Sequence, residues 1–217
     1  MAVEVVPIEV CKVEAGLETL LAPDAGEWER AAEAAVPIDP TPLDRQPSAY
    51  VQAAWRDRPR GGSGEVRVRA AAGASGLAVR LDWTALRPSR LISDVNMYPD
   101  ACAVIFPADG REAEFSTMGS PEHPVQGWHW RAGTDVPFAV TATGIGTVER
   151  AAEHPVQGRA QWADGRWQVV LAGPLGVEGI PLRKGSAMPV AFAVWSGVAR
   201  ERAGLKSHSP QPCELRL

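Results

Sequence analysis

The residue types that most often carry out catalysis have no catalytic spacing in this sequence. There is no Gly-x-Ser-x-Gly nucleophile motif, no His-Glu-x-x-His zinc motif and no glycine-rich phosphate loop. Gly144 and Gly146 form an isolated Gly-x-Gly with no helical pattern after it, which does not predict a dinucleotide site. None of the four histidines has the spacing of a zinc ligand pair, and each is expected on a loop or at the surface: His123, His129, His154 and His208.

The segment FSTMGSPEHPVQGWHWRA, residues 115–132, is the least ordinary stretch of the chain. Met118 lies in a tight Thr-Met-Gly-Ser-Pro turn, and a strand with Trp128 and Trp130 in period two follows it. Core packing does not need a methionine at a loop tip, so Met118 either covers an apolar edge or has a functional role. Lys206 lies in a charged loop, where a lysine is usually a solvated charge.

Short apolar runs separated by turn signals predict the strands that must position these residues. Alternation predicts an antiparallel pair at 65–69 and 77–83, and Asp164-Gly165 predicts the tight turn of a hairpin over 159–175. A weak helical pattern, ended by Pro23, lies within 14–30, and helix is expected only in segments such as 17–34. The proline-rich stretch 31–47 is expected to be irregular. Further strands are expected at 1–13, 100–107, 137–144, 188–195 and 213–217. The pattern predicts one all-β domain over residues 1–217, an antiparallel β-sandwich with a few short helices in its loops.

Composition narrows the class of protein further. The chain has 217 residues, 45% of them hydrophobic and 22% charged, which is ordinary for a soluble globular domain. A net charge of −4 with no basic cluster disfavours nucleic acid as a partner. No apolar run approaches the roughly 18 residues of a membrane span. Eight tryptophans against four phenylalanines and two tyrosines suggest that the fold packs a flat, partly polar object.

Cys11, Cys102 and Cys213 are the three cysteines, and no two of them are close in the sequence. A Cys-x-x-Cys metal site and a Cys-x-x-Cys-His covalent haem site are therefore both excluded. Cys11 and Cys213 lie near the two termini, in segments expected to be strands. They could form a disulfide if those strands are neighbours, or all three thiols could be free and buried.

Four stretches, taken together, resemble the γ subunits of the periplasmic molybdenum oxidoreductases related to dimethyl sulfoxide reductase. That group includes ethylbenzene dehydrogenase, dimethylsulfide dehydrogenase, selenate reductase and chlorate reductase. The stretches cover about half of the chain, in the same order: YPDACAVIFP (98–107), TMGSPEHPVQGWHWRA (117–132), QWADGRWQVVLAGPL (161–175) and MPVAFAVWSGVARERAGLKSHS (188–209). The chain departs from the pattern at Gly173, where relatives often carry an arginine.

The resemblance implies a β-sandwich that holds one non-covalent haem b, with Met118 and Lys206 as the axial ligands of the iron. A thioether is neutral, and a lysine can bind iron only as its free amine, which burial favours by depressing the pKa. Trp128, Trp130 and Trp195 are the first candidates to line the haem pocket, although ordinary core packing remains open for each. The rival ligands are Met97, Met188 and His129, of which the two methionines are better explained by packing.

The same resemblance implies a role without catalysis on this chain. The γ subunit passes electrons between an iron–sulfur β subunit and an external partner such as a soluble cytochrome c, while the molybdenum α subunit carries out the reaction. A periplasmic location is implied by the resemblance alone, because residues 1–10 have neither the basic nor the apolar region of an export signal. The alternative from another class is a carbohydrate-binding β-sandwich that stacks sugar rings on exposed tryptophans.

Overall fold

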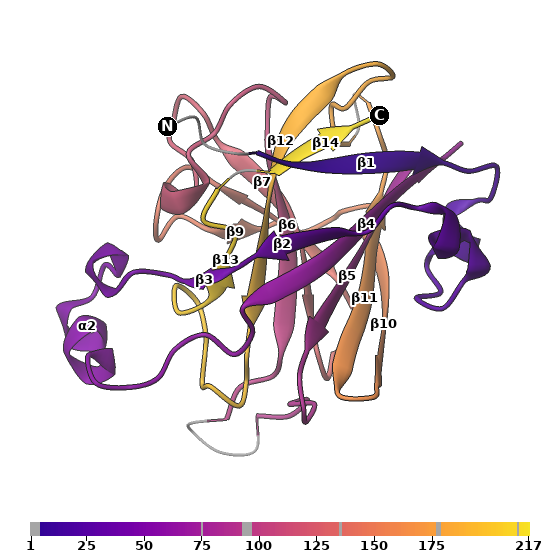
Figure 1. Cartoon of the computed structure of the whole chain (residues 1–217). Coiled ribbons are helices and arrows are strands. Elements are labelled where there is room, and N and C mark those ends of the chain that lie inside the picture. The colour runs from indigo at the N-terminus through magenta and orange to yellow at the C-terminus, as the bar shows by residue number, and fades with distance from the viewer. Residues whose placement is uncertain (1–4, 75, 93–96, 135, 177–178, 212) are drawn as a thin grey trace.

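Two curled β-layers pack face to face in a computed structural model of the chain (Figure 1). The structure describes residues 5–74, 76–92, 97–134, 136–176, 179–211 and 213–217. The first layer, here called the hairpin sheet, has the order β10(Gln157–Ala163), β11(Arg166–Gly173), β5(Gly76–Thr84), β4(Glu65–Gly73), with β2(Ala34–Pro37) also paired to β4.

The second layer, here called the pocket sheet, has the order β12(Ala187–Trp195), β6(Ala101–Pro107), β7(Val125–Arg131), β8(Phe138–Ala142), β9(Glu149–Arg150). At its edge β13(Ser207–His208) pairs with β12 and with β3(Asp39–Pro40). The two layers are joined through β1(Val6–Lys12) and β14(Cys213–Arg216), which lie between β4 and β12. The expected all-β sandwich is confirmed.

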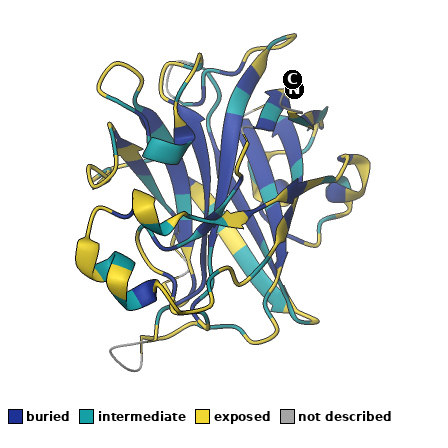
Figure 2. Ribbon diagram, turned by 60° about the vertical axis from the view of Figure 1, so that its left-hand side comes forward, coloured by how far each residue is buried: buried dark blue, intermediate teal, exposed yellow. Residues whose placement is uncertain are grey.

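The core lies between the two layers and is built by alternation along the strands. On β6 the even-numbered residues Cys102, Val104 and Phe106 join the central core, and the odd-numbered Ala103 and Ile105 face outward into a separate cluster. Both faces of β6 are covered, which explains its unbroken apolar sequence. Figure 2 shows burial concentrated in the strands, with most of the loops and short helices exposed.

Several strand predictions are confirmed in detail. β4 and β5 form the expected antiparallel pair, and β10 and β11 form the expected hairpin. Asp164 and Gly165 both have positive φ, 50° and 74°, as a two-residue turn of this hand requires. The pairing is antiparallel except at β1, which runs parallel to both β14 and β4. The predicted strand at 1–13 is described only from residue 5, so Val3 lies outside the described residues.

The region 14–60 differs most from the prediction. The helical pattern at 17–34 becomes two short pieces, α1(Leu17–Leu20) and the 3-10 helix η1(Gly26–Arg30). The stretch 31–47 is not irregular throughout, because β2, β3 and the 3-10 helix η2(Leu43–Arg45) form within it. The helix α2(Ala49–Trp55) was not predicted. Its first turn is capped by the Ser48 hydroxyl, which accepts from the Val51 amide at 3.4 Å.

The cysteines are free thiols. The terminal strands do run side by side, but their register pairs Cys213 with Val6 and pairs Cys11 with Ala71 on β4. Five residues of strand, about 16 Å, therefore separate Cys11 from the residue opposite Cys213, and a disulfide cannot span that distance. Among the described residues, no helix has the length and apolar character needed to cross a membrane.

Candidate functional site

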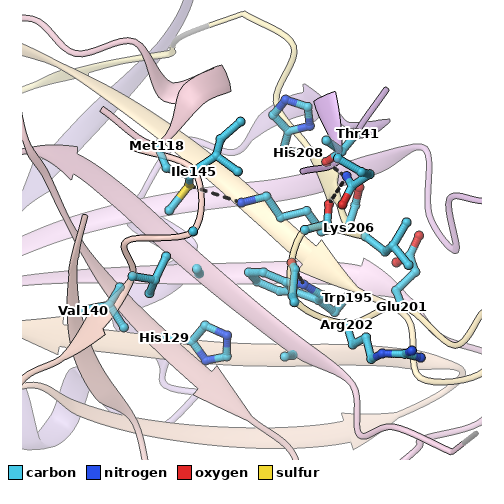
Figure 3. A pocket seen from close by; sticks show the side chains of 18 of the residues that line it. Thr41, Met118, His129, Val140, Ile145, Trp195, Glu201, Arg202, Lys206 and His208 are labelled. Carbon is cyan, nitrogen blue, oxygen red and sulfur yellow. Dashed lines mark hydrogen bonds between the residues drawn. The ribbon is translucent and has the colours of Figure 1, made fainter. Parts of the chain in front are cut away.

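A cavity of about 660 Å³ lies on the outer face of the pocket sheet. This volume is within the range of pockets that hold small molecules and cofactors. Its floor comes from outward-facing residues of β6, β7, β8 and β12, and its walls come from the turn at 115–118 and the loops at 145–148 and 201–206. Figure 3 shows side chains from these separate elements converging on one space.

Small residues on the floor leave room for a large ligand. Ala101 and Ala103 of β6 line the cavity, and the outward-facing positions 191 and 193 on the neighbouring β12 are also alanine. A longer side chain at any of these outward positions would project into the space above the sheet. Larger apolar side chains also line the cavity, including Phe115, Phe138 and Trp195.

Met118 and Lys206 meet across this cavity. The Nζ atom of Lys206 lies 3.4 Å from the Sδ atom of Met118 and donates to it (Figure 3). Met118 follows the 3-10 helix η3(Phe115–Thr117) and has a left-handed backbone, φ 60° and ψ 41°. Such a backbone costs a non-glycine residue free energy and is common at functional sites. The carbonyl of Met118 accepts from the Gly144 amide at 3.0 Å, which fixes the turn against the loop after β8.

The loop that carries Lys206 is held by hydrogen bonds from three directions. The amide and the hydroxyl of Thr41 both donate to the Lys206 carbonyl, at 2.8 and 3.1 Å. Gln46 Nε2 donates to the Gly204 carbonyl at 2.9 Å, and Trp195 Nε1 donates to the Ala203 carbonyl at 2.9 Å. These bonds fix the backbone on both sides of Lys206, so its side chain enters the cavity from a rigid wall.

Glu201 fixes the base of the same loop. Its side chain is only 2% exposed and accepts from the amides of Gly61 and Ser196 at 3.0 and 2.8 Å. Burial raises the pKa of Glu201, although both amide donors act in the opposite direction. Because both carboxylate oxygens accept from backbone amides, Glu201 holds the base of the loop in place.

The environment of the cavity favours the uncharged forms of two side chains that line it, Lys206 and His129. Burial lowers the pKa of Lys206 from 10.5 to about 8, so the free amine is much more accessible than in water. Burial and then the Lys206 charge lower the pKa of His129 to about 3, with smaller contributions from Arg131 and Arg150. His129 is therefore neutral at physiological pH.

His129 was expected on a loop or at the surface, and that expectation is wrong. It lies on β7 and faces the cavity, stacked on Phe138 with a centroid distance of 4.5 Å and tilted against Trp195 at 5.0 Å. Its buried Nδ1 atom has no hydrogen-bond partner among the described residues. The sequence could have placed His129 on a strand, because it lies between Trp128 and Trp130 in period two and so faces the side opposite to both.

The three candidate tryptophans are not brought together. Trp195 lines the cavity, whereas Trp128 and Trp130 belong to the central core between the layers. Trp130 packs edge-on against Trp167 at 4.9 Å, and Trp128 packs edge-on against Phe106 at 5.0 Å. The expectation that Trp128 and Trp130 wall the pocket is thus corrected: alternation along β7 directs both indoles inward and His129 outward.

The rival methionines do not reach the cavity either. Met188 is 1% exposed in the central core, which confirms packing as its role. Met97 is 46% exposed and, unlike Met118, is not among the residues that line the cavity.

The departure at Gly173 has a structural explanation. A Cβ at this position would lie 2.8 Å from Cζ2 of Trp128, because the indole packs directly over the glycine backbone. Any larger side chain at position 173 would therefore displace Trp128 from the core. Gly173 lies in the core contact between β11 and β7 and is not part of the cavity.

The chain is similar to curated subunits of reductases and of a dehydrogenase. The chain is 35% identical over 144 residues to the chlorate reductase subunit gamma of Ideonella dechloratans, a match that covers 65% of this chain and 60% of the relative. It is 30% identical over 138 residues to the dimethylsulfide dehydrogenase subunit gamma of Rhodovulum sulfidophilum. This match covers 59% of this chain and 51% of the relative. The chain is a homologue of these γ subunits.

A third homologue carries a cofactor in its name. The "Putative respiratory nitrate reductase heme subunit ORF7" of Haloferax mediterranei is 34% identical over 147 residues, covering 66% of this chain and 53% of the relative. The homologous region thus spans between about half and three-fifths of the length of these relatives. No protein-family model matches the chain.

Solved structures show the fold. The chain is similar, with a TM-score of 0.55, to a carbohydrate binding module of family 9 from Caldicellulosiruptor kristjanssonii solved in complex with glucose. The similarity covers 97% of this chain and 95% of the module, with 10% sequence identity. At that identity the likeness concerns the architecture alone.

Proposed function

We propose that this chain is the electron-transfer subunit of a multi-subunit oxidoreductase and binds one non-covalent haem b between Met118 and Lys206. The observation that carries the proposal is the 3.4 Å approach of Lys206 Nζ to Met118 Sδ inside an apolar cavity. A thioether and a free amine are both ligands for haem iron, and their convergence is difficult to explain by packing. The name of the Haloferax mediterranei homologue supports the cofactor.

The residues present fit this cofactor in chemistry and in space. Burial lowers the pKa of Lys206 to about 8, which favours the amine that a metal requires. The alanine floor and the aromatic walls suit an apolar macrocycle. The sequence has no Cys-x-x-Cys-His motif, consistent with a haem held without covalent bonds. Once bound, the haem would supply reversible one-electron transfer between its ferrous and ferric states.

The chain's own residues hold and shield the group, and they carry out no chemical step of their own. Met118 and Lys206 would be the residues that hold the iron of the haem. Trp195 and Phe138 exclude water from the cavity, and the hydrogen bonds around Lys206 fix its direction of approach. Within the described residues, no group of three His, Cys, Asp or Glu side chains could hold a further metal ion.

The partners follow from the relatives rather than from the geometry. We infer a heterotrimer with a molybdenum-containing α subunit and an iron–sulfur β subunit, since homologues are named as γ subunits of chlorate reductase and dimethylsulfide dehydrogenase. The chain would pass electrons between the β subunit and an external partner such as a soluble cytochrome c, in the periplasm.

A carbohydrate-binding role is less well supported. The chain shares the fold of the family 9 module, but stacking of sugar rings needs exposed indoles. All eight tryptophans lie in the described residues, and none of them is exposed.

Haemin titration distinguishes the two functions. We expect the purified chain to take up one equivalent of haemin and to give the sharp bands of a six-coordinate low-spin haem after reduction. A chain that stays colourless and binds glucose or cello-oligosaccharides would overturn the proposal.

A further inference from the structure

The residues that line the cavity carry an unusual balance of charge. They include four cations, Arg45, Arg131, Arg202 and Lys206, and one carboxylate, Glu201. The whole chain has a net charge of −4, so this cationic lining is opposite in sign to the rest of the protein. Glu201 offsets only one of these charges, and both of its oxygens already accept from backbone amides. A concave cationic site of this kind attracts an anionic ligand.

Two of these arginines lie at the same end of the cavity. The strand register aligns Arg131 of β7 with Ala101 of β6, and Ala101 with Trp195 of β12, so these three residues form one row across the floor. The guanidinium of Arg202 lies 4.6 Å from the ring centroid of Tyr98, three residues before Ala101. Arg131 and Arg202 therefore flank the end of the cavity at which β6 begins.

The turn that carries Met118 lies at the other end of the pocket sheet. Gly144, which donates to the Met118 carbonyl, follows the end of β8, and β8 ends opposite Val125, at the start of β7. Arg131 lies at the opposite end of the same strand. Figure 3 likewise has Arg202 beyond Trp195, on the side of the cavity away from Met118. Apart from Lys206, which meets Met118, the cations Arg131 and Arg202 thus lie at the rim of the cavity farthest from Met118.

Both arginines have charge available for a ligand. Neither Arg131 nor Arg202 forms a salt bridge with any residue that the structure describes, and both are exposed at the rim. Several arginines of the two sheets are paired by contrast, as Arg69 is with Glu33 at 3.2 Å. A guanidinium binds a carboxylate with two parallel hydrogen bonds, so each arginine suits one carboxylate.

We propose that Arg131 and Arg202 bind the two carboxylates of a dianionic tetrapyrrole and thereby fix its orientation in the cavity. This inference rests on the proposed haem-binding function. It makes the two arginines positioning residues: they select a ligand with acidic groups at one edge and hold that edge at the solvent-exposed rim, while Met118 and Lys206 reach the centre of the ring.

The test compares iron protoporphyrin IX with its dimethyl ester, in which both carboxylates are neutral. Each is titrated into the wild-type chain and into Arg131→Gln, Arg202→Gln and the double variant, with binding followed at the Soret band. Arg159→Gln is the matched control, since Arg159 lies exposed on β10 of the other sheet. We expect the double variant to lose about tenfold to a hundredfold in affinity for the diacid and little for the ester.

The outcomes separate this inference from the function on which it rests. Loss of diacid affinity with an unchanged low-spin spectrum supports the assignment, because the iron ligands are then intact. Equal diacid affinity in the wild type and the double variant overturns the assignment of the arginines but leaves haem binding in place. If the wild type binds neither porphyrin, the proposed function fails, and this inference fails with it.

Discussion

The amine of Lys206 lies 3.4 Å from the thioether of Met118, although 88 residues separate them in the sequence. A thioether is a weak hydrogen-bond acceptor, so this contact repays little of the cost of burying a lysine. The left-handed backbone at Met118 adds a further cost. Two unfavourable features that meet in one apolar cavity are best explained by a ligand that both residues bind.

The affinity for haem should depend on pH through Lys206. Only the free amine binds iron, and burial holds the pKa of Lys206 at about 8, so its protonated form competes with the metal below that pH. We expect affinity to fall by up to about tenfold for each pH unit of acidification below about pH 8, and to level off above it. Haemin titrations at several pH values measure this. Lys206→Met should lack this component of the slope, and a flat wild-type profile below pH 8 would argue against lysine ligation.

The tryptophans on the two faces of the pocket sheet should behave differently when each is replaced by phenylalanine. Trp130→Phe leaves a small cavity in the core and loses no hydrogen bond, since Trp130 Nε1 has no partner among the described residues. It should lower the free energy of unfolding by about 1–2 kcal/mol and leave haem binding unchanged. Trp195→Phe loses the bond to Ala203 that holds the Lys206 loop, and should weaken haem binding severalfold. Urea denaturation and haemin titration distinguish the two, and weaker haem binding in Trp130→Phe would contradict the placement of Trp130 in the core.

Gly173→Ala should destabilise the fold without a direct effect on the cavity. The added methyl group would lie 2.8 Å from Trp128, and such overpacking costs about 1–3 kcal/mol. Gly64→Ala is the matched control, because nothing lies within 4 Å of a Cβ at position 64. Urea midpoints of the two variants test the prediction. Equal stability of Gly173→Ala and the wild type would mean that Trp128 does not pack over this backbone.

Thiol labelling should distinguish the three cysteines. Cys102 and Cys213 are buried, and burial raises the pKa of Cys102 well above its usual value and that of Cys213 to about 12. Native protein should therefore react rapidly with Ellman's reagent at one thiol, Cys11, and at all three after denaturation. Only one reactive thiol in the denatured, unreduced protein would instead indicate a disulfide and contradict the three free thiols of the structure.

The sequence predicted most strands because their signals are local. The Asp164-Gly165 turn and the apolar run of β6 each depend on neighbouring residues only. The β1 pairing could not be predicted, since the register that separates Cys11 from Cys213 depends on contacts between the two ends of the chain. The faces of Trp128 and Trp130 were predictable only relative to His129, because alternation says which residues share a face and not which face is the core.

In the candidate site, too, contacts between distant parts of the chain could not be predicted from local sequence signals. Met118 and Lys206 were predicted from a family resemblance, and the spacing of the residues alone would not have paired them. Two supports of the Lys206 loop, Thr41 and Gln46, come from a distant segment, and Glu201 within the loop accepts from the amide of the distant Gly61. None of these contacts gave a signal in the sequence. Their roles depend on the folded chain, in which the region 40–61 lies against the loop after β12.

The absorption spectrum of haem-reconstituted ligand variants tests the central claim most directly. Met118→Ala and Lys206→Met remove the proposed ligands one at a time, while Met97→Ala and Lys184→Met serve as controls outside the cavity. We predict that each ligand variant loses the six-coordinate low-spin spectrum or fails to retain haem, and that both controls keep the wild-type bands. A low-spin spectrum that survives unchanged in both Met118→Ala and Lys206→Met would contradict the placement of the haem between these two residues.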